Sequence, residues 1–369
     1  MILIPHGFQP AYERGFSNGL AHTGVKVTLV GSDWTDTARI DTRVEVLNLR
    51  GSQDGSRSTV EKTLNLLRYH LRLLRLVFSR RSSVIHVIGL FRYPVLMGLL
   101  EAFFFGIFSR RYVLTVHNLL PHDCHSALNF QIYRRIYRIP DLLVVHTQSM
   151  KEGLCKSFHV PEEKVIVMEH GCEIEFPGRA NAVPITGAQQ IDRSDRSFTL
   201  LFFGNIAPYK GLDVLLQAFE GLGHEFKLNI VGVCRNAEYG GYIRELITRS
   251  PARGCIKWCD RFVTEEEMWE AFSTASAVIL PYRHIDQSGV LFQALCFGLP
   301  VVAARVGEFE RYVSKDFGEV FAPADFSELK LAIQRVYQRR HEFSRKKIIA
   351  RAQQLDWRKT VSVLQSAYS

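Results

Sequence analysis

The chain has little of several features that mark particular classes of protein. Its seven cysteines are odd in number and mostly isolated along 369 residues, which argues against a disulfide framework and favours a reducing compartment. Its longest apolar run, residues 95–108, is 14 residues long and is interrupted by Glu101. A transmembrane helix needs roughly 20 apolar residues. We therefore expect a buried or interfacial helix there and no membrane span.

Motifs for metals, nucleic acids and secretion are also missing. No HExxH or acidic DxD follows a strand, and no second Cys/His pair accompanies Cys255 and Cys259, so we expect no metal ion and no other cofactor. Aromatic residues do not alternate with the arginines, which argues against nucleic acid as a partner. Met1 leads directly into the strand-like MILIP without a basic region. We expect no signal peptide and a cytoplasmic protein.

One region carries a marked excess of positive charge. The net charge is +9, and residues 50–140 contain 14 Lys and Arg but only 4 Asp and Glu. Within this region, residues 59–81 place leucines at helical spacing, with Arg68, Arg72 and Arg75 between them. Two interpretations stay open: a solvated helix whose leucines pack inward, and a basic amphipathic helix that binds an anionic membrane surface.

Short apolar runs alternate with helical segments, which is typical of a parallel, doubly wound α/β sheet. The alternation lapses between 180 and 197, where the sequence is polar and interrupted. We predict two Rossmann-like domains at 1–182 and 198–352, a linker at 183–197, and a C-terminal helix at 353–369 that could pack back across either domain. The predicted strands are 2–5, 25–31, 44–49, 84–89, 112–117, 142–147, 165–171, 198–204, 226–232, 255–259, 277–282, 300–304 and 319–323.

The most informative stretch is 278–302, VILPYRHIDQSGVLFQALCFGLPVV. An apolar strand ends in Pro-Tyr, a polar loop follows, and Ser288-Gly289 opens an amphipathic helix that stops at Gly298. The first N–H groups of a helix lack intrahelical partners and the helix dipole favours negative charge there. The stretch therefore predicts an anion site that suits a diphosphate.

A lysine follows another predicted strand. Lys210 and Gly211 lie in a turn after TLLFFG, and a helix is expected to begin near Leu212. At the carboxyl end of a parallel strand, such a lysine would face the same cleft as the Ser288 helix start and neutralise a diphosphate as a point charge. The alternative, an exposed turn lysine, stays open.

These motifs resemble a known family. GNIAPYKGLDVLLQAF, RFVTEEEMWEAFSTASAVILPY and DQSGVLFQALCFGLPVVAARVGEFERYV are similar to the nucleotide-sugar half of retaining glycosyltransferase family 4, here with a QSG-type loop. TVHNLLPHD and ILIPHGFQPAYERG resemble its acceptor half. The resemblance covers residues 2–335, is more specific in the C-terminal half, and implies the two-domain GT-B fold, with two Rossmann-like domains facing across a cleft.

The resemblance also implies roles for individual residues. Lys210 would contact the donor diphosphate, and His117 would lie beside the transferred sugar. The remaining donor-binding candidates are the backbone of Ser288, Gly289 and Val290 at the diphosphate, the main chain of Val263 at the base, Gly232 in the same pocket, and Gly7 in the loop under the diphosphate and acceptor.

Three positions depart from the family pattern. Two glutamates eight positions apart are common in the family, but Ile285 and Gln293 occupy these positions here. Asp286, a catalytic candidate, could replace the first carboxylate by a one-residue shift, and Gln293 can still hydrogen-bond a ribose. Where an arginine often precedes the lysine, the candidate positions hold Asn205 and Ala207. A phosphate partner is therefore missing unless another arginine, 261, 283 or 305, reaches the site.

Several histidines follow predicted strands, where catalytic groups collect. These are His6, His117, His122 and His170, whereas His86 lies inside VIHVIG and is predicted to be a hydrogen-bonded core residue.

The resemblance implies a metal-independent hexosyltransferase that moves a sugar from a UDP- or GDP-linked donor, with retention of configuration. We expect the acceptor to be a glycan or polyprenyl-diphosphate-linked oligosaccharide of bacterial surface polysaccharide synthesis. Such an acceptor would be used by a protein that is peripheral on the inner face of the cell membrane. Two alternatives stay open: a weak or inactive relative that binds a partner transferase, and a nucleotide-sugar epimerase.

Overall fold

The computed structural model describes residues 1–5, 10–54, 56–80, 83–89, 95–120, 126–173 and 197–368. The chain divides into two compact units. Unit 1 comprises Met1–Glu173 together with Leu355–Ser369, and unit 2 comprises Ile174–Gln354. Apart from Ser197, the predicted linker 183–197 lies outside the described residues.

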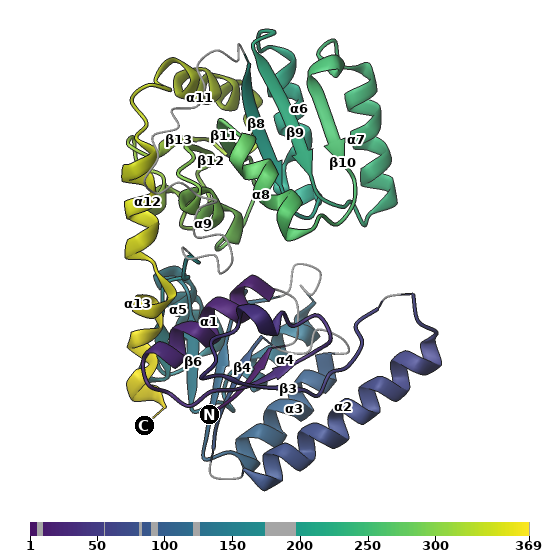
Figure 1. The fold of residues 1–369 in the computed structure, drawn as a ribbon, viewed down its shortest axis with the longest axis vertical. Coiled ribbons are helices and arrows are strands. Elements are labelled where there is room, and N and C mark those ends of the chain that lie inside the picture. The colour runs from purple at the N-terminus through teal and green to yellow at the C-terminus, as the bar shows by residue number, and fades with distance from the viewer. Residues whose placement is uncertain are drawn as a thin grey trace. The chain divides into compact units, whose positions relative to one another are not determined.

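Unit 1, in which Figure 1 labels β3, β4 and β6, is built on a parallel sheet. The strand order is β3-β2-β1-β4-β5-β6-β7. Its strands are Ile2–Pro5 (β1), Thr28–Gly31 (β2), Glu45–Asn48 (β3), Val84–Ile88 (β4), Arg111–Thr115 (β5), Leu142–Val145 (β6) and Val165–Val167 (β7). Its helices before the C-terminal segment are Pro10–His22 (α1), Thr59–Ser79 (α2), Val95–Phe108 (α3), Ala127–Ile136 (α4) and Gln148–Phe158 (α5), with 3-10 turns at Thr37–Arg39 and Glu162–Lys164.

Successive strand residues of unit 1 point to opposite faces of the sheet. In β1, Ile2 and Ile4 join the core beneath α2 to α5, whereas Leu3 joins the core beneath α1 and the C-terminal segment. Both faces are buried, which explains why the strands are continuous apolar runs in the sequence.

The C-terminal segment belongs to unit 1, although α12 (Arg345–Gln354), which precedes it, lies in unit 2. The prediction of one helix over 353–369 is wrong. The helix stops at Gln354, because Cys172 donates its N–H to Leu355 O at 2.6 Å and Asp356 then caps a new short helix through Arg358 N. This helix is α13 (Trp357–Thr360), followed by the 3-10 helix η5 (Val361–Ala367).

Unit 2 has a six-stranded parallel sheet in the order β10-β9-β8-β11-β12-β13. Its strands are Phe198–Phe203 (β8), Phe226–Val231 (β9), Ile256–Cys259 (β10), Ala277–Leu280 (β11), Val301–Ala304 (β12) and Gly318–Phe321 (β13). Its helices besides α12 are Leu212–Glu220 (α6), Ala237–Arg249 (α7), Glu265–Thr274 (α8), Gly289–Cys296 (α9), Phe309–Tyr312 (α10) and Phe326–Gln338 (α11), with 3-10 turns at Pro208–Lys210 and Arg253–Cys255.

The predicted α/β fold with two Rossmann-like units is confirmed, and each predicted strand overlaps an observed one. The helix expected near Leu212 begins at that residue, and the helix expected after Ser288 begins at Gly289. Among the described helices, none is both long and apolar enough to cross a bilayer.

Candidate functional site

In unit 2, the end of β8 lies tightly between the ends of its two neighbours, β9 and β11. A Cβ on Gly232 would lie 1.9 Å from the carbonyl oxygen of Gly204, and a Cβ on Gly211 would lie 2.0 Å from that of Pro281. Gly232 and Gly211 also have φ values of 148° and 68°, which other residues rarely adopt. Glycine at these positions therefore lets the three strand ends meet.

Lys210 ends the 3-10 turn that follows β8, and it is only 7% exposed. Its Nζ atom lies 5.2 Å from the centre of the Tyr282 ring, and a Cβ on Gly204 would come within 2.7 Å of it. The Nζ ammonium of Lys210 makes no hydrogen bond or ion pair with any residue that the structure describes, although the backbone N–H donates to Ala207 O at 2.9 Å. The interpretation as an exposed turn lysine is wrong. Burial lowers the pKa of Lys210, because no anion replaces the lost hydration.

The N-terminus of α9 lies beside the same turn. Ser288 is the buried N-cap residue but makes no capping bond, and its Oγ atom lies 3.4 Å from the hydroxyl oxygen of Tyr282. Tyr282 therefore contacts both Lys210 and Ser288. A Cβ on Gly204 would lie 3.7 Å from Cγ2 of Val290. Gly204 is thus flanked by the lysine and the first turn of α9.

This arrangement can hold an anion. The first N–H groups of α9 have no intrahelical partner, and the helix dipole places partial positive charge at them. A buried ammonium next to them adds a full charge in a medium that screens it poorly. The strand order reverses between β8 and β11, and ligands of open α/β sheets bind at such a point.

The other predicted donor-binding residues of unit 2 lie on neighbouring turns. Gly232 follows β9 and accepts a hydrogen bond from the Trp258 indole at 3.1 Å. Val263 is partly buried and directly precedes Thr264, whose side chain caps α8. Asn205 is exposed and directly follows Gly204. Asn205, Gly232 and Val263 follow three adjacent strands, β8, β9 and β10.

Two glutamines at and near the N-terminus of α9 have unsatisfied side-chain amide atoms, and one of them occupies a position where the family has a glutamate. Gln293 lies one turn into α9, and its buried Nε2 atom has no hydrogen-bond partner among the described residues. The same holds for both amide atoms of Gln287, a residue that the sequence did not single out. Buried amides normally find a partner. These two side chains therefore have hydrogen-bonding capacity left for a ligand.

Asp286 and Ile285 are both partly buried, and a Cβ on Gly307 would meet their backbone oxygens at 2.6 and 2.1 Å. Burial raises the pKa of Asp286, and the nearby Glu308 raises it further while His284 opposes the shift. A carboxyl group in this position is easier to protonate than an exposed one. Ile285 offers no polar side chain to a ligand.

The three arginines considered as replacement phosphate partners all pair with carboxylates. Arg283 binds Asp213 with two contacts, at 3.0 and 2.5 Å. Arg261 pairs with Glu267, and Arg305 lies 3.1 Å from Glu310. The Asp213 carboxylate also accepts a hydrogen bond from Tyr239. Lys210 is therefore the buried cation of this site within the described residues.

In unit 1, His117 belongs to a cluster of rings at the carboxyl ends of adjacent strands. It lies two residues beyond β5, His146 directly follows β6, and His170 follows β7. The ring of Tyr12, on α1, lies 4.9 Å from His117, 5.5 Å from His146 and 5.3 Å from His170. The sheet topology therefore brings together three histidines that are far apart in sequence.

Burial favours the neutral form of the histidines in this cluster. His146 Nδ1 donates to Met168 O at 2.9 Å, and Tyr12 OH is 3.2 Å from the other ring nitrogen. Burial lowers the pKa of His146 to about 4 and that of His170 to about 3. Burial, together with the neighbouring histidines, lowers the pKa of His117 well below its ordinary value. This part of unit 1 therefore offers neutral rings.

His86 and Trp357 are two further buried residues next to the cluster. Both ring nitrogens of His86 are hydrogen-bonded, to Tyr368 OH and Thr115 Oγ1 at 2.7 Å each, which confirms it as a core residue. Trp357 lies 4.8 Å from the ring of Tyr12. Gly15 and Gly171 pack against the indole of Trp357. A Cβ atom on Gly15 would lie 2.1 Å from the indole, and a Cβ atom on Gly171 would lie 2.0 Å from it.

Sequence reasoning missed Tyr12, His146, Trp357 and Tyr282 as parts of the two sites. His146 could have been found, because it directly follows an apolar run as His117 does. Tyr282 stands in the Pro-Tyr that ends such a run. Tyr12 and Trp357 gave no signal, since their role depends on contacts between distant segments.

Some predicted residues lie outside the described part of the chain: Gly7, His6 and His122. Among the residues that are described, no three His, Cys, Asp or Glu side chains lie close enough to hold a metal ion together. Arg68, Arg72 and Arg75 are exposed residues of α2.

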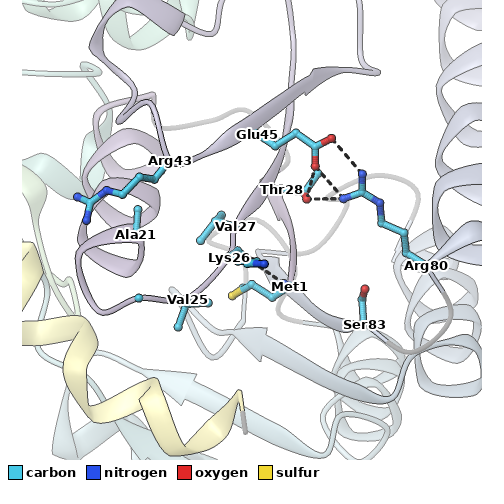
Figure 2. Close-up of a pocket in the computed structure, with 11 residues that line it drawn as sticks. Met1, Ala21, Val25, Lys26, Val27, Thr28, Arg43, Glu45, Arg80 and Ser83 are labelled. Carbon is cyan, nitrogen blue, oxygen red and sulfur yellow. Dashed lines mark hydrogen bonds and ion pairs between the residues drawn. The ribbon is translucent and has the colours of Figure 1, made fainter.

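A cavity of about 570 Å³ lies at the opposite, amino-terminal edge of the unit 1 sheet (Figure 2). Arg80 at its wall binds Glu45 at 2.8 and 3.0 Å and Thr28 at 2.6 Å. Arg43 also lines the cavity, and it pairs with Asp41, which does not line it. These two arginines are already neutralised, and none of the predicted site residues lines this cavity.

Comparison with known families matches both halves of the chain. Residues 12–176 match the model of "Glycosyltransferase Family 4", and residues 197–339 match that of "Glycosyl transferases group 1". Both halves of the chain are glycosyltransferase domains of the GT-B type. The sites described above lie one in each of these GT-B domains.

Curated relatives of this GT-B chain include an uncharacterized glycosyltransferase of Methanocaldococcus jannaschii, 26% identical over 207 residues. That alignment covers 53% of this chain and 52% of the relative. GDP-mannose:glycolipid 4-beta-D-mannosyltransferase of Xanthomonas campestris is 33% identical over 203 residues, covering 52% and 49% of the two chains. The GT-B chain thus spans about half the length of these curated relatives.

Among solved structures, Anabaena HepE in complex with UDP-glucose aligns with a TM-score of 0.72 at 17% identity. The alignment covers 99% of this chain and 97% of HepE. At this identity the likeness shows the shared GT-B fold.

Proposed function

We propose that the protein is a retaining glycosyltransferase that moves a sugar from a UDP- or GDP-linked donor to an acceptor hydroxyl. The observation that carries this proposal is the buried, unpaired ammonium of Lys210 beside the N-terminus of α9. Burying such a cation without a partner is costly, and a diphosphate would relieve that cost. The glycosyltransferase family models over both halves support the same reading.

In the proposed reaction, the bond between the anomeric carbon and the diphosphate oxygen breaks, and its electron pair leaves with the diphosphate. Lys210 and the amides of Ser288, Gly289 and Val290 stabilise the charge that develops there. The acceptor oxygen bonds to the anomeric carbon from the face that the diphosphate leaves, which retains the configuration. Its proton passes to the departing diphosphate. His117 positions the sugar as a neutral ring, and Asp286 is the candidate carboxylate at the sugar hydroxyls.

The donor class is proposed from the site and from similar proteins. Gln293 and Gln287 have amide groups without partners that suit the hydroxyls of a ribose and a sugar. The Xanthomonas relative is named for GDP-mannose, and HepE was solved with UDP-glucose. No metal ion takes part in the proposed reaction.

The acceptor is proposed to be lipid-linked, a polyprenyl-diphosphate oligosaccharide of bacterial surface polysaccharide synthesis. The Xanthomonas relative's name specifies a glycolipid acceptor. A cytoplasmic protein would meet such an acceptor at the inner face of the membrane. Arg68, Arg72 and Arg75 are proposed to contact the anionic lipids there.

Titration calorimetry with UDP, GDP and their sugars tests the donor site directly. One nucleoside diphosphate and its sugars should bind to the parent protein, and Lys210→Ala should weaken that binding. Lys227, an exposed residue of β9, supplies the control variant Lys227→Ala, which should bind as the parent does. If the folded parent binds none of these compounds, the proposed function is wrong.

A second candidate, a non-catalytic relative that binds a nucleotide sugar or a partner transferase, is favoured by Ile285, Gln293 and the three occupied arginines. Donor consumption with extracted bacterial lipid-linked oligosaccharide as acceptor separates the two. Binding of the donor without consumption at any acceptor concentration would favour the second candidate.

A further inference from the structure

We propose that α2 and α3 form one membrane-inserting surface, in which apolar side chains enter the lipid and arginines along one edge select anionic headgroups. This inference rests on the proposed function, in which the arginines alone contact the membrane, and it adds apolar residues to that contact. It assigns a salt-resistant part of the binding to apolar residues, which include leucines that the sequence left open as core residues.

Helix α2 has two apolar faces on opposite sides. Its core face carries Tyr69, Leu73, Leu76 and Val77, all buried. The opposite face carries large apolar residues at helical spacings of three, four and seven positions, and these side chains are 45–68% exposed: Val60, Leu64, Leu67, Leu71 and Phe78. A solvated helix places polar residues there. Hence the structure corrects the interpretation in which the leucines all pack inward.

Helix α3 extends this surface. Leu100, Phe103 and Ile107 recur at helical spacing and are 50–66% exposed. The two helices meet through Phe78, whose ring lies 6.1 Å from Phe104 and 4.8 Å from Phe108. Figure 1 shows α2 and α3 side by side at one edge of unit 1. The exposed residues of both helices therefore form one apolar patch.

The charge pattern of the patch suits a lipid surface. On α2, Arg68, Arg72 and Arg75 lie along one side of the leucine stripe, and they make no ion pair with a described residue. The acidic residue of α3, Glu101, is buried and lies 3.5 Å from His70, within the contact between the helices. A broad apolar face with an unopposed cationic edge is typical of helices that lie in the interface of an anionic bilayer.

Two contributions to binding can be separated by salt. Headgroup attraction is screened at high ionic strength, because the Debye length falls from about 10 Å at 0.1 M to about 3 Å at 1 M. Insertion of apolar side chains persists under those conditions. A purely electrostatic surface would therefore release from vesicles in about 1 M salt, whereas the proposed surface stays partly bound.

The test is co-sedimentation of the full chain, without donor or acceptor, with phosphatidylglycerol vesicles and with phosphatidylcholine vesicles. The parent should bind the anionic vesicles and retain part of that binding in high salt. Leu67→Gln/Leu71→Gln/Phe103→Gln should lower the affinity at least about thirtyfold and abolish the salt-resistant part. Arg68→Glu/Arg72→Glu/Arg75→Glu should lower it at least about a hundredfold and remove the preference for anionic lipid.

Matched controls come from exposed residues elsewhere. Phe326→Gln/Leu331→Gln/Val363→Gln removes three apolar side chains of similar exposure. Lys227→Glu/Arg249→Glu/Lys257→Glu changes the net charge as much as the arginine variant does, on exposed residues of unit 2. Both controls should bind vesicles as the parent does. Circular dichroism and thermal unfolding confirm that every variant is folded.

Absence of parent binding to anionic vesicles would overturn the proposal, and so would equal binding by the glutamine variant of the patch. Sedimentation equilibrium tests whether a second copy of the chain, and not a membrane, binds this surface. Self-association that the patch variant abolishes, without vesicle binding by the parent, would assign the surface to a dimer instead. Donor binding by calorimetry is measured separately, so failure of vesicle binding leaves the donor site standing.

Discussion

The strand ends of the two units have similar topology and opposite chemistry. In unit 2, a buried lysine, glycine backbone and a helix N-terminus converge between β8 and β11. In unit 1, the corresponding edge holds clustered histidine, tyrosine and tryptophan rings, and the buried Arg14 of α1 is paired with Glu173 at 2.6 Å. Unit 2 thus suits a group with full negative charge, and unit 1 suits a neutral, ring-shaped one.

The difference shows that the fold determines only where a ligand site forms. Both parallel sheets bring loops together at the carboxyl ends of their strands. What is bound there depends on a few residues after each strand. The histidines make the contrast measurable. His86 and His146 of unit 1 are fully buried, whereas the three histidines of unit 2, at positions 224, 284 and 341, are exposed.

The largest expected effect is acid unfolding of unit 1 before unit 2. Burial lowers the pKa of His86 to about 3 and of His146 to about 4, from 6.5. The unfolded chain binds these protons first as pH falls below 6.5, so folding stability is lost from that pH down to about 4 for His146 and about 3 for His86. Each histidine should cost about 2 kcal/mol at about pH 5, or about 4 kcal/mol together.

Pulsed hydrogen–deuterium exchange after incubation at each pH measures this, because its peptides resolve the two units. Unit 1 peptides should gain deuterium at pH values where unit 2 peptides stay protected. His224→Gln, which removes an exposed histidine of unit 2, should leave both transitions unchanged. If both units open at the same pH, or unit 2 opens at a higher pH, the buried histidines do not make unit 1 the more acid-sensitive unit.

The next effect should come from Lys210→Ala. Loss of the buried cation should lower kcat by about 10²–10³-fold, or about 2.7–4 kcal/mol, because the departing diphosphate loses its charged partner. Nucleoside diphosphate binding should weaken as well. Steady-state donor consumption and calorimetry measure the two quantities. A variant with parental turnover would remove Lys210 from the proposed reaction.

At pH values near and above the lowered pKa of Lys210, donor binding should also take up a proton at this residue. Burial lowers the pKa of Lys210 in the free protein, and a bound diphosphate raises it again. Affinity should therefore fall as pH rises through the lowered pKa, and uptake should be seen as a dependence of the binding enthalpy on the buffer's ionisation enthalpy. Lys210→Ala should abolish this dependence. Its persistence in that variant would assign the proton to another group.

A smaller effect is expected from His117→Ala in unit 1. Turnover should fall about tenfold to a hundredfold, because a group that positions the sugar is removed, while UDP or GDP binding stays parental. Steady-state kinetics measures the turnover, and calorimetry on the same preparation measures UDP or GDP binding. Weaker nucleotide binding in this variant would break the separation of roles between the units.

The strands could be predicted because parallel strands buried on both faces are continuous apolar runs bounded by glycine, proline or polar residues. The Ser288 helix start and the turn of Lys210 could be found for the same reason. Periodicity could not decide which side of α2 faces the core, because the helix has leucines on both sides. The structure resolves this ambiguity through Tyr69 and Leu73, which are buried.

Contacts between segments that are distant in the chain could not be predicted from the sequence. The path of the C-terminal segment depends on the hydrogen bond from Cys172 to Leu355 and on the glycines around Trp357. The pairing of Arg283 with Asp213 likewise joins residues 70 positions apart. Such partners are chosen by tertiary packing, which leaves no local pattern.

The smallest expected effect is a gain from Gln293→Glu in unit 2. A carboxylate would accept hydrogen bonds from a ribose more strongly than the neutral amide does, worth about 1 kcal/mol or about fivefold in donor affinity. Calorimetry with the nucleotide sugar measures the gain, and Gln217→Glu, on an exposed glutamine of α6, serves as the control that should not reproduce it. Affinity that falls in Gln293→Glu would show that the amide N–H, which a carboxylate lacks, makes the contact. In that case unit 2 has exchanged an acceptor for a donor at the ribose, and its chemistry departs further from that of the charged sites it resembles.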